Sequence, residues 1–404
     1  MRGVFARRAS WELDASPVAA CVRERRRRRL PVLDLSETNP THVGLAGPGE
    51  ALAAALAEVA SDPASLRYEP DPRGDRSARE AIATYHRAQG AALDPDHVIL
   101  TAGTSEGYAH LFRLLADPGD RVHLPSPGYG LFEHLAALEG LEAVPYRLLQ
   151  SPSAAHWRVD QPALAASLAP RSRALLAIHP HNPTGSLLDP DDLAAFRALA
   201  RERELALISD EVFAESGAGA TGFTSLLCRA EDGPPHFVLS GASRLLGLPQ
   251  LKLAWIAVAG RPAQRDEALA RLEVIADAYL SVSPLLARTL ARLLPQRAAL
   301  LEPLRARLAA NRAQLATLDP ARGIAALPSE AGWAAILRLP SHEPDDEALT
   351  LGLLAHTGVH VQPGSLFELE PRPGEAQLVL SLLPEPGLFA RGLAALADFA
   401  ATLA

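Results

Sequence analysis

Short apolar runs alternate with amphipathic segments from about residue 93 to residue 260. The apolar runs have the length of buried strands, and the amphipathic segments carry apolar side chains at helical spacing. The predicted strands lie within residues 97–103, 121–127, 173–185, 205–211, 236–243 and 253–260. The segments predicted to be helical are residues 104–116, 130–140 and 189–204. This order of strand, helix and strand predicts a mostly parallel sheet with helices on both faces.

The remainder of the chain predicts a second, smaller unit. Residues 287–318 are rich in Ala and Leu and predict helices, whereas residues 324–404 mix short strands and helices. The expected fold class is therefore α/β, a mostly parallel, doubly wound central sheet with a smaller α+β domain. We expect residues 1–45 to form an N-terminal arm and part of the small domain. Residues 46–286 would form the large domain, and residues 287–404 an interdomain helix and the small C-terminal domain.

Composition narrows the class of protein further. The 404 residues, 48% of them hydrophobic, are enough for a large core and two domains. A net charge of −8 gives no reason to expect nucleic-acid binding, and no apolar run of about 18 residues predicts a membrane span. Two cysteines, Cys21 and Cys228, do not indicate a disulfide scaffold, so the reducing cytoplasm is the expected location.

Polar turn segments follow four of the predicted strands. They are the sequences TAGTS, HNPTG, SDE and SGASR, which begin at residues 101, 181, 209 and 240. Because ligands of open parallel sheets bind at the carboxyl ends of the strands, we expect these segments to line one crevice.

Two of the segments suggest a site for an anion. Gly103, Thr104 and Ser105 lie between a strand and a helix, where backbone N–H groups and hydroxyls meet an anion at the helix N-terminus. A plain helix cap is the alternative. Lys252, the only lysine of the chain, begins another strand and can supply a point charge to the same anion.

The other segments suggest a planar, protonated ring. Asp210 ends an apolar strand and needs a cationic partner, which a protonated heteroaromatic nitrogen would supply; its alternative role is a helix cap. Asn182 offers donor and acceptor groups on a tight turn, and Tyr129 could cover a ring face or belong to the core. Together these residues predict a site for a planar, phosphorylated, pyridine-like molecule.

Seven segments of the chain resemble those of a known family. The segments DLSETNPT, RYEPDPRGDRSAREAIATYH, TAGTSEG, HNPTG, SDEVF, SGASRLLGLPQLKLAW and VHVQPGSLFEL resemble, in order and spacing, those of the class I/II aminotransferases. The resemblance implies the aspartate aminotransferase fold, pyridoxal 5'-phosphate as cofactor, and transfer of an amino group between an amino acid and a 2-oxo acid. It also implies a homodimer with its active sites at the subunit interface, and no metal ion.

The resemblance assigns roles to individual residues. Asp210 would pair with the pyridine nitrogen, Asn182 would bond the phenolic oxygen, and Tyr129 would stack on the ring. The phosphate would be held by the cofactor-binding segments that contain Gly103, Thr104, Ser105, Ser240, Ser243 and Lys252. Tyr68, and less clearly Ser283, would reach the cofactor of the partner subunit, across which Trp11 and Leu13 would lie. Asn39, Gly44 and Val379 would lie on the substrate side.

Three positions depart from the family pattern. Arg244 stands where the family has its Schiff-base lysine, and Lys252 follows eight residues later, at the position of the cationic phosphate ligand. The alternative alignment makes Lys252 the attaching lysine, but it breaks this spacing and leaves the phosphate without its cation. Phe213 replaces a tyrosine that bonds the ring oxygen. Val379 replaces the arginine that binds the substrate carboxylate, a task that Arg372 of a nearby loop is one candidate to take over.

The first departure bears directly on activity. A lysine amine attaches the cofactor and then moves a proton, whereas a guanidinium stays charged and is a poor nucleophile and a poor base. Three hypotheses follow: an impaired transaminase with Arg244 as a weak substitute, a lysine-free enzyme with another base such as His181, or a non-catalytic homologue that binds the cofactor or an amino acid.

Overall fold

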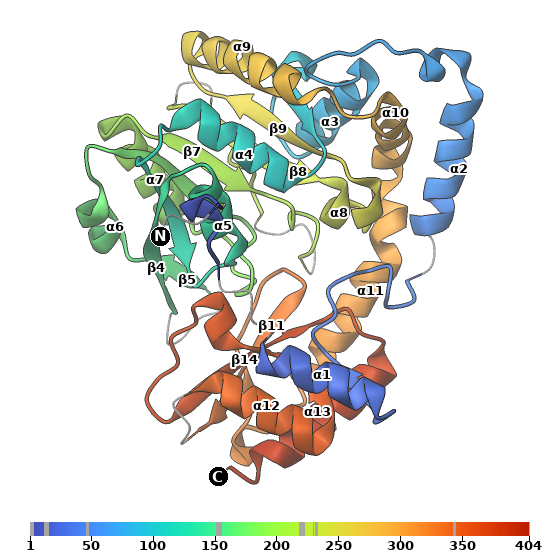
Figure 1. Ribbon diagram of the computed structural model, residues 1–404, viewed down its shortest axis with the longest axis vertical. Helices are drawn as coiled ribbons and strands as arrows, with labels where there is room; N and C mark the ends of the chain where they lie inside the picture. Colours follow the sequence, from blue (N-terminus) through green and yellow to red (C-terminus); the bar gives the residue numbers. More distant parts are fainter. Residues whose placement is uncertain are drawn as a thin grey trace.

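The computed structural model describes residues 4–11, 16–45, 48–150, 156–217, 223–228, 230, 233–341 and 345–403. An eight-stranded sheet forms the upper part of the molecule in Figure 1, and a smaller sheet lies below it. The strands of the large sheet, in spatial order, are β2 (Val98–Thr101), β9 (Ala254–Ala259), β8 (His236–Gly241), β7 (Ala206–Asp210), β6 (Ser172–Ile178), β3 (Arg121–Ser126), β4 (Glu142–Gln150) and β5 (Trp157–Val159).

Strand direction explains why the turns converge. Strands β8, β7, β6, β3 and β4 run parallel, whereas β9 is antiparallel to both of its neighbours, β8 and β2. Strand β2 therefore runs in the same direction as β8, and its carboxyl end lies at the same sheet edge. Strand β9 begins at that edge, which brings Lys252 to it.

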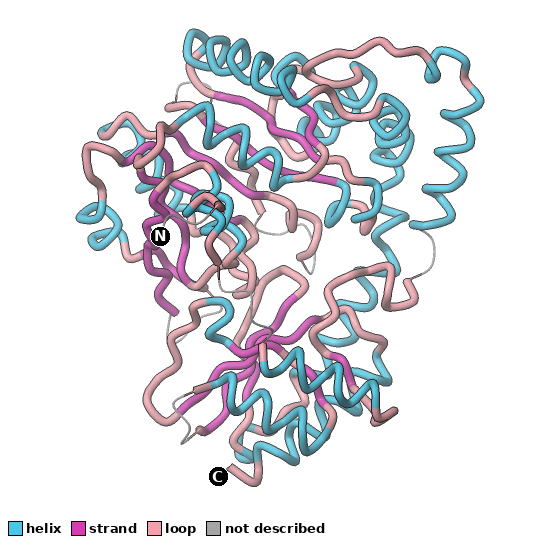
Figure 2. Tube along the Cα trace, in the orientation of Figure 1, coloured by secondary structure: helices cyan, strands magenta, loops and turns pink. Residues whose placement is uncertain are grey.

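Helices cover both faces of this sheet (Figure 2). Successive side chains of β2 point to opposite faces of the sheet. Ile99 packs with α4, α5 and α9 on one face, whereas Val98 and Leu100 pack with α3 and α10 on the other. The helices are α2 (Pro48–Ser61), α3 (Arg76–Ala88), α4 (Thr104–Leu115), α5 (Leu131–Leu138), α6 (Gln161–Ser167), α7 (Pro190–Glu202), α8 (Ala242–Leu245), α9 (Pro262–Tyr279) and α10 (Pro284–Leu293).

The smaller sheet is antiparallel and has its own core. Its strands, in spatial order, are β10 (Ala325–Ala326), β11 (Ala334–Pro340), β14 (Glu375–Ser381) and β13 (Gln362–Pro363), while β1 (Leu33–Asp34) pairs separately with β12 (Val359–His360). Helices α1 (Pro17–Arg27), α12 (Asp346–Thr357) and α13 (Pro386–Ala400) pack around it. Helix α11 (Arg297–Leu315) runs from the upper part of the molecule to the lower (Figure 1).

The expected fold class is confirmed, with a mostly parallel central sheet and a smaller α+β unit. The boundaries at residues 45/46 and 286/287 stay a prediction, and residue 46 itself lies outside the described residues, as does Leu13. Within the described ranges, every helix is too short or too polar to cross a membrane.

Candidate functional site

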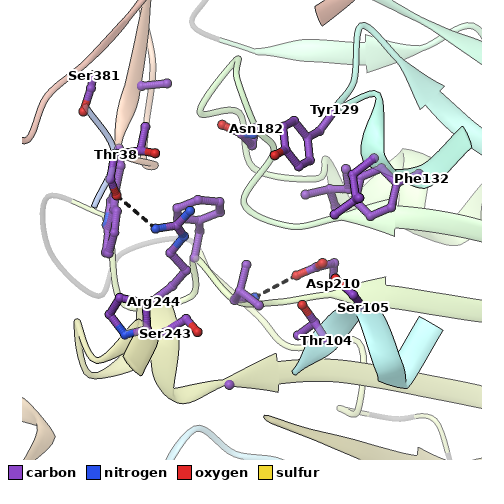
Figure 3. A pocket seen from close by; sticks show the side chains of 18 of the residues that line it. Thr38, Thr104, Ser105, Tyr129, Phe132, Asn182, Asp210, Ser243, Arg244 and Ser381 are labelled. Atoms are coloured by element: carbon purple, nitrogen blue, oxygen red, sulfur yellow. Dashed lines mark hydrogen bonds between the residues drawn. The ribbon is translucent and has the colours of Figure 1, made fainter. Parts of the chain in front are cut away.

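A cavity of about 430 Å³ opens at the carboxyl edge of the large sheet, facing the small sheet. The segments at the carboxyl ends of β2, β6, β7 and β8 contribute Ser105, Asn182, Asp210 and Ser243 to its wall. Figure 3 shows these side chains around one space. The expectation that the four polar turns share a crevice is therefore confirmed by the geometry.

One end of the cavity is suited to an anion. Helix α4 begins at Thr104, and Thr104 and Ser105 line the cavity, so the N-terminus of a helix lies at its wall. Lys252 adds a cation here, since a β-carbon placed on Gly103 would lie 3.8 Å from the Lys252 Nζ. The backbone of Lys252 is left-handed (φ 51°), which turns the chain from a short 3₁₀ helix into β9.

Asp210 is the buried carboxylate of the cavity. Its Oδ2 accepts a hydrogen bond of 2.8 Å from the Tyr108 hydroxyl, and its Oδ1 accepts one of 3.1 Å from the Val212 N–H. Burial raises the pKa of Asp210 to about 6, although both hydrogen bonds and the charge of Arg244 act to lower it. A cation placed in the cavity would therefore stabilise the ionised form.

Aromatic residues and an amide form the remaining walls. Tyr129 is half exposed and meets Phe132 edge to face, with 6.3 Å between the ring centroids. Phe213 is buried and packs edge to face against Trp333 at 5.7 Å. Asn182 lies near Tyr129 in the view of Figure 3, and both line the cavity. Aromatic rings therefore make up much of the wall of the cavity.

Arg244 extends from helix α8 across the cavity to the small-sheet side. Its Nη1 donates a hydrogen bond of 3.2 Å to the carbonyl oxygen of Thr38. Its guanidinium carbon lies 4.7 Å from the Trp333 ring centroid and 5.6 Å from that of Phe213. Figure 3 shows this head group on the side of Thr38 and Ser381, away from Asp210.

Some predicted site residues do not line the cavity. Ser240 is buried within β8, where it pairs with Trp255. Asn39 turns back on its own loop, where its Oδ1 accepts hydrogen bonds from the N–H and hydroxyl of Thr41. Gly44 occupies a left-handed turn (φ 68°) further along that loop.

Tyr68 and Ser283 also lie outside the cavity of their own chain. Both are exposed, Tyr68 at 83%. Val379, by contrast, is buried in β14 and lines the cavity. Arg372 is exposed and lines a different depression, beside Arg147.

Several lining residues were missed by sequence reasoning. Tyr108 lies one helical turn after Thr104, so the spacing of α4 already placed both on one face. Ser36, Thr38, Trp333 and Ser381 come from the small-sheet side, and no local sequence pattern links them to the turns of the large sheet.

Comparison with solved structures identifies the fold. The structure matches an alanine aminotransferase from Pyrococcus furiosus with a TM-score of 0.85 at 22% identity, covering 98% of this chain and 99% of that one. A Thermus thermophilus aspartate aminotransferase mutant matches with a TM-score of 0.83 at 23% identity, over 99% and 100% of the two chains. The large and small sheets thus define the aspartate aminotransferase fold.

Sequence comparison identifies the family. The family model "Aminotransferase class I and II" matches residues 31–379, so the chain belongs to this family. The chain is 28% identical to a valine–pyruvate aminotransferase of Mycobacterium tuberculosis over 352 residues, 85% of each chain. It is 35% identical to a probable N-succinyldiaminopimelate aminotransferase of the same organism over 169 residues, 41% of each. The cofactor of the family is pyridoxal phosphate.

The cavity fits that cofactor. The Lys252 Nζ lies beside Gly103, immediately before the start of α4, where a phosphate is favoured. Asp210 is a buried carboxylate whose raised pKa calls for a cation. The lysine and the helix N-terminus therefore match a phosphate, and the buried carboxylate matches a protonated pyridine nitrogen.

The raised pKa of Asp210 makes the stability of the cofactor-free protein depend on pH. The folded pKa of about 6 exceeds the unfolded value of about 3.9, so the folded state binds more protons between these values. Asp210 therefore destabilises the fold above pH 6, by up to about 3 kcal/mol, and this cost is lost as the pH falls toward 4. Asp210→Asn should gain stability over wild type at pH 8, and the gain should shrink by pH 4.5. Thermal unfolding measures it; an equal difference at both pH values would contradict the assignment.

Proposed function

We propose that this chain binds pyridoxal phosphate without a covalent link and is an impaired aminotransferase, which moves an amino group between an amino acid and a 2-oxo acid. One observation carries the proposal. At the family's lysine position, the guanidinium of Arg244 is held by Thr38 and by the rings of Phe213 and Trp333. It is therefore anchored to the small-sheet side of the cavity.

The other residues keep the roles that bind and orient the cofactor. In this proposal Asp210 keeps the pyridine nitrogen protonated, Tyr129 covers the ring, and Asn182 bonds the ring oxygen. Lys252 and the start of α4 hold the phosphate. The bound cofactor supplies an electron sink that acidifies the Cα–H of an amino acid.

Proton transfer at that carbon is the step this chain performs poorly. The step needs a base that is neutral for part of the cycle, and the guanidinium of Arg244 is protonated near neutral pH. His181 does not replace it, because burial lowers the pKa of His181 to about 3 and its Nδ1 lies 3.0 Å from the Thr184 hydroxyl. A base with so low a pKa is weak at pH 7.

Cofactor titration and a turnover assay test the proposal. Pyridoxal phosphate is expected to bind and to be removed by dialysis. With alanine, valine, aspartate and tyrosine as donors and 2-oxo acids as acceptors, we expect keto-acid production over hours. Failure to bind the cofactor would contradict the proposal. Turnover in the ordinary range of roughly 1–10³ s⁻¹ would contradict the impairment. Binding with no turnover at all would leave the non-catalytic homologue as the function.

A homodimer is part of the proposed function. Tyr68 is 83% exposed and lies outside the cavity of its own chain, which supports its expected role at the partner's cofactor. Sedimentation velocity at micromolar concentration with cofactor should show a dimer. A monomer under these conditions would contradict the shared site.

A further inference from the structure

We infer that Arg244 binds the carboxylate of the amino-acid or 2-oxo-acid substrate, the task of the family arginine that Val379 replaces. The inference rests on the proposed function, which supplies the substrate class. Arg244, at the lysine position, would then bind an anion instead of acting as a nucleophile.

Arg244 has no close ion-pair partner among the described residues, although Asp210 attracts it at longer range. Within the described ranges, no carboxylate lies within ion-pair distance of its guanidinium, and its one side-chain hydrogen bond goes to a neutral carbonyl, that of Thr38. A guanidinium has five N–H donors in a planar fork, so most of them are free to bind a ligand. Burial lowers the pKa of Arg244 although Tyr129 and Asp210 act to raise it, so a bound anion would stabilise the buried guanidinium further.

The guanidinium lies on the side of the cavity that contains Val379, the position that the resemblance assigns to the family's carboxylate-binding arginine. Its contacts, Thr38 and Trp333, are fixed beside the end of β14: the Leu382 N–H donates to Trp333 O at 2.8 Å, and the Ser381 N–H donates to Leu35 O at 2.6 Å. Val379 lies in the same strand and lines the same cavity. Arg244 therefore places a cation beside the strand from which the arginine is missing.

The charges of the cavity match one ligand class. Among the described residues that line it, three are charged: Asp210, Arg244 and Lys252. Lys252 lies at the start of α4, whereas the Arg244 head group lies on the opposite side of the view in Figure 3. A phosphate on Lys252, a ring cation on Asp210 and a carboxylate on Arg244 would pair each charge once. The ligand is thus a phosphorylated pyridine together with a carboxylate-bearing substrate.

A structural latch is the competing role. Arg244 joins helix α8 to the small-sheet side through Thr38 and Trp333, and such a bridge could serve closure alone. If Arg244 is only a latch, ligands with and without a carboxylate should bind with equal affinity. If Arg244 is a carboxylate receptor, the ligand with the carboxylate should bind more tightly. The two roles therefore separate in a binding experiment that needs no turnover.

The experiment compares two stable probes by calorimetry, phosphopyridoxyl-L-alanine and phosphopyridoxyl-ethylamine, which differ only in the carboxylate. Wild type is expected to bind the alanine conjugate about 10- to 100-fold more tightly, the range of charge-assisted hydrogen bonds. Arg244→Met, which keeps apolar packing on the rings, should reduce this ratio to near one while the ethylamine conjugate binds as before. Arg244→Gln, which retains a donor for Thr38, should do the same.

Arg372→Met is the matched control, because it removes the other candidate arginine. It should leave the ratio unchanged. Equal binding of the two conjugates by wild type would establish the latch and overturn the inference, as would loss of the ratio in Arg372→Met. Failure of wild type to bind either conjugate would instead contradict the proposed function.

Discussion

Replacing Arg244 by lysine should attach the cofactor to the chain and raise amino-group transfer by on the order of 10²–10⁴, the usual contribution of a general base. Arg244 begins on α8 at the cavity wall, and a lysine of similar length at position 244 reaches the same space. Near the cofactor its amine can lose its proton at neutral pH, which the guanidinium cannot.

The gain should appear in kcat. If Arg244 also binds the substrate carboxylate, the same change should raise KM for the amino acid, since the ammonium of lysine cannot form the bidentate contact. Arg244→Met serves as the control, because it removes the charge without supplying an amine. A folded, cofactor-binding Arg244→Lys variant with neither attachment nor turnover would show that residue 244 does not occupy the lysine position.

Removing the charge of Lys252 should weaken cofactor binding by about 10- to 100-fold in Lys252→Ala. The Lys252 Nζ lies beside Gly103 at the start of α4, where the proposal places the phosphate. The measurement is the Kd of pyridoxal phosphate by fluorescence titration.

Lys252→Arg is the matched control, because it keeps the cation. It should bind the cofactor within a few-fold of wild type. Inorganic phosphate should compete with the cofactor for Lys252. The difference in Kd between Lys252→Ala and wild type should therefore be smaller when phosphate is present. Equal Kd values for Lys252→Ala and wild type would remove Lys252 from the phosphate site.

The sequence predicted the elements that meet at the sheet edge because local signals mark them. Turn residues follow apolar runs at Thr101, Ile178 and Asp210, and each turn lines the cavity. Strand β4 was not predicted, since Glu142–Gln150 mixes charged, apolar and proline residues near the sheet edge. The antiparallel direction of β9 also has no local signal, because it depends on pairing between distant segments.

The site residues that belong to one local sequence motif could be predicted from the sequence. Lys252, Thr104 and Asp210 lie where the motifs placed them. The Thr38 contact of Arg244 joins residues 206 positions apart, and its geometry follows from the packing of the small sheet against the large one. For the same reason the N-terminal loop contributes Ser36 and Thr38 to the cavity, whereas Asn39 and Gly44 had been expected there.

Borohydride reduction tests the central claim most directly, because Lys252 is the only lysine in the sequence. The wild-type protein is saturated with pyridoxal phosphate, reduced, digested and mapped by mass spectrometry, with Lys252→Arg as the blank. We expect an unmodified peptide around Lys252 in the wild-type protein, and a cofactor-sized adduct at position 244 in the Arg244→Lys variant alone. An adduct on Lys252 of the wild-type chain would show that this lysine is the reactive one and that Arg244 has not replaced it.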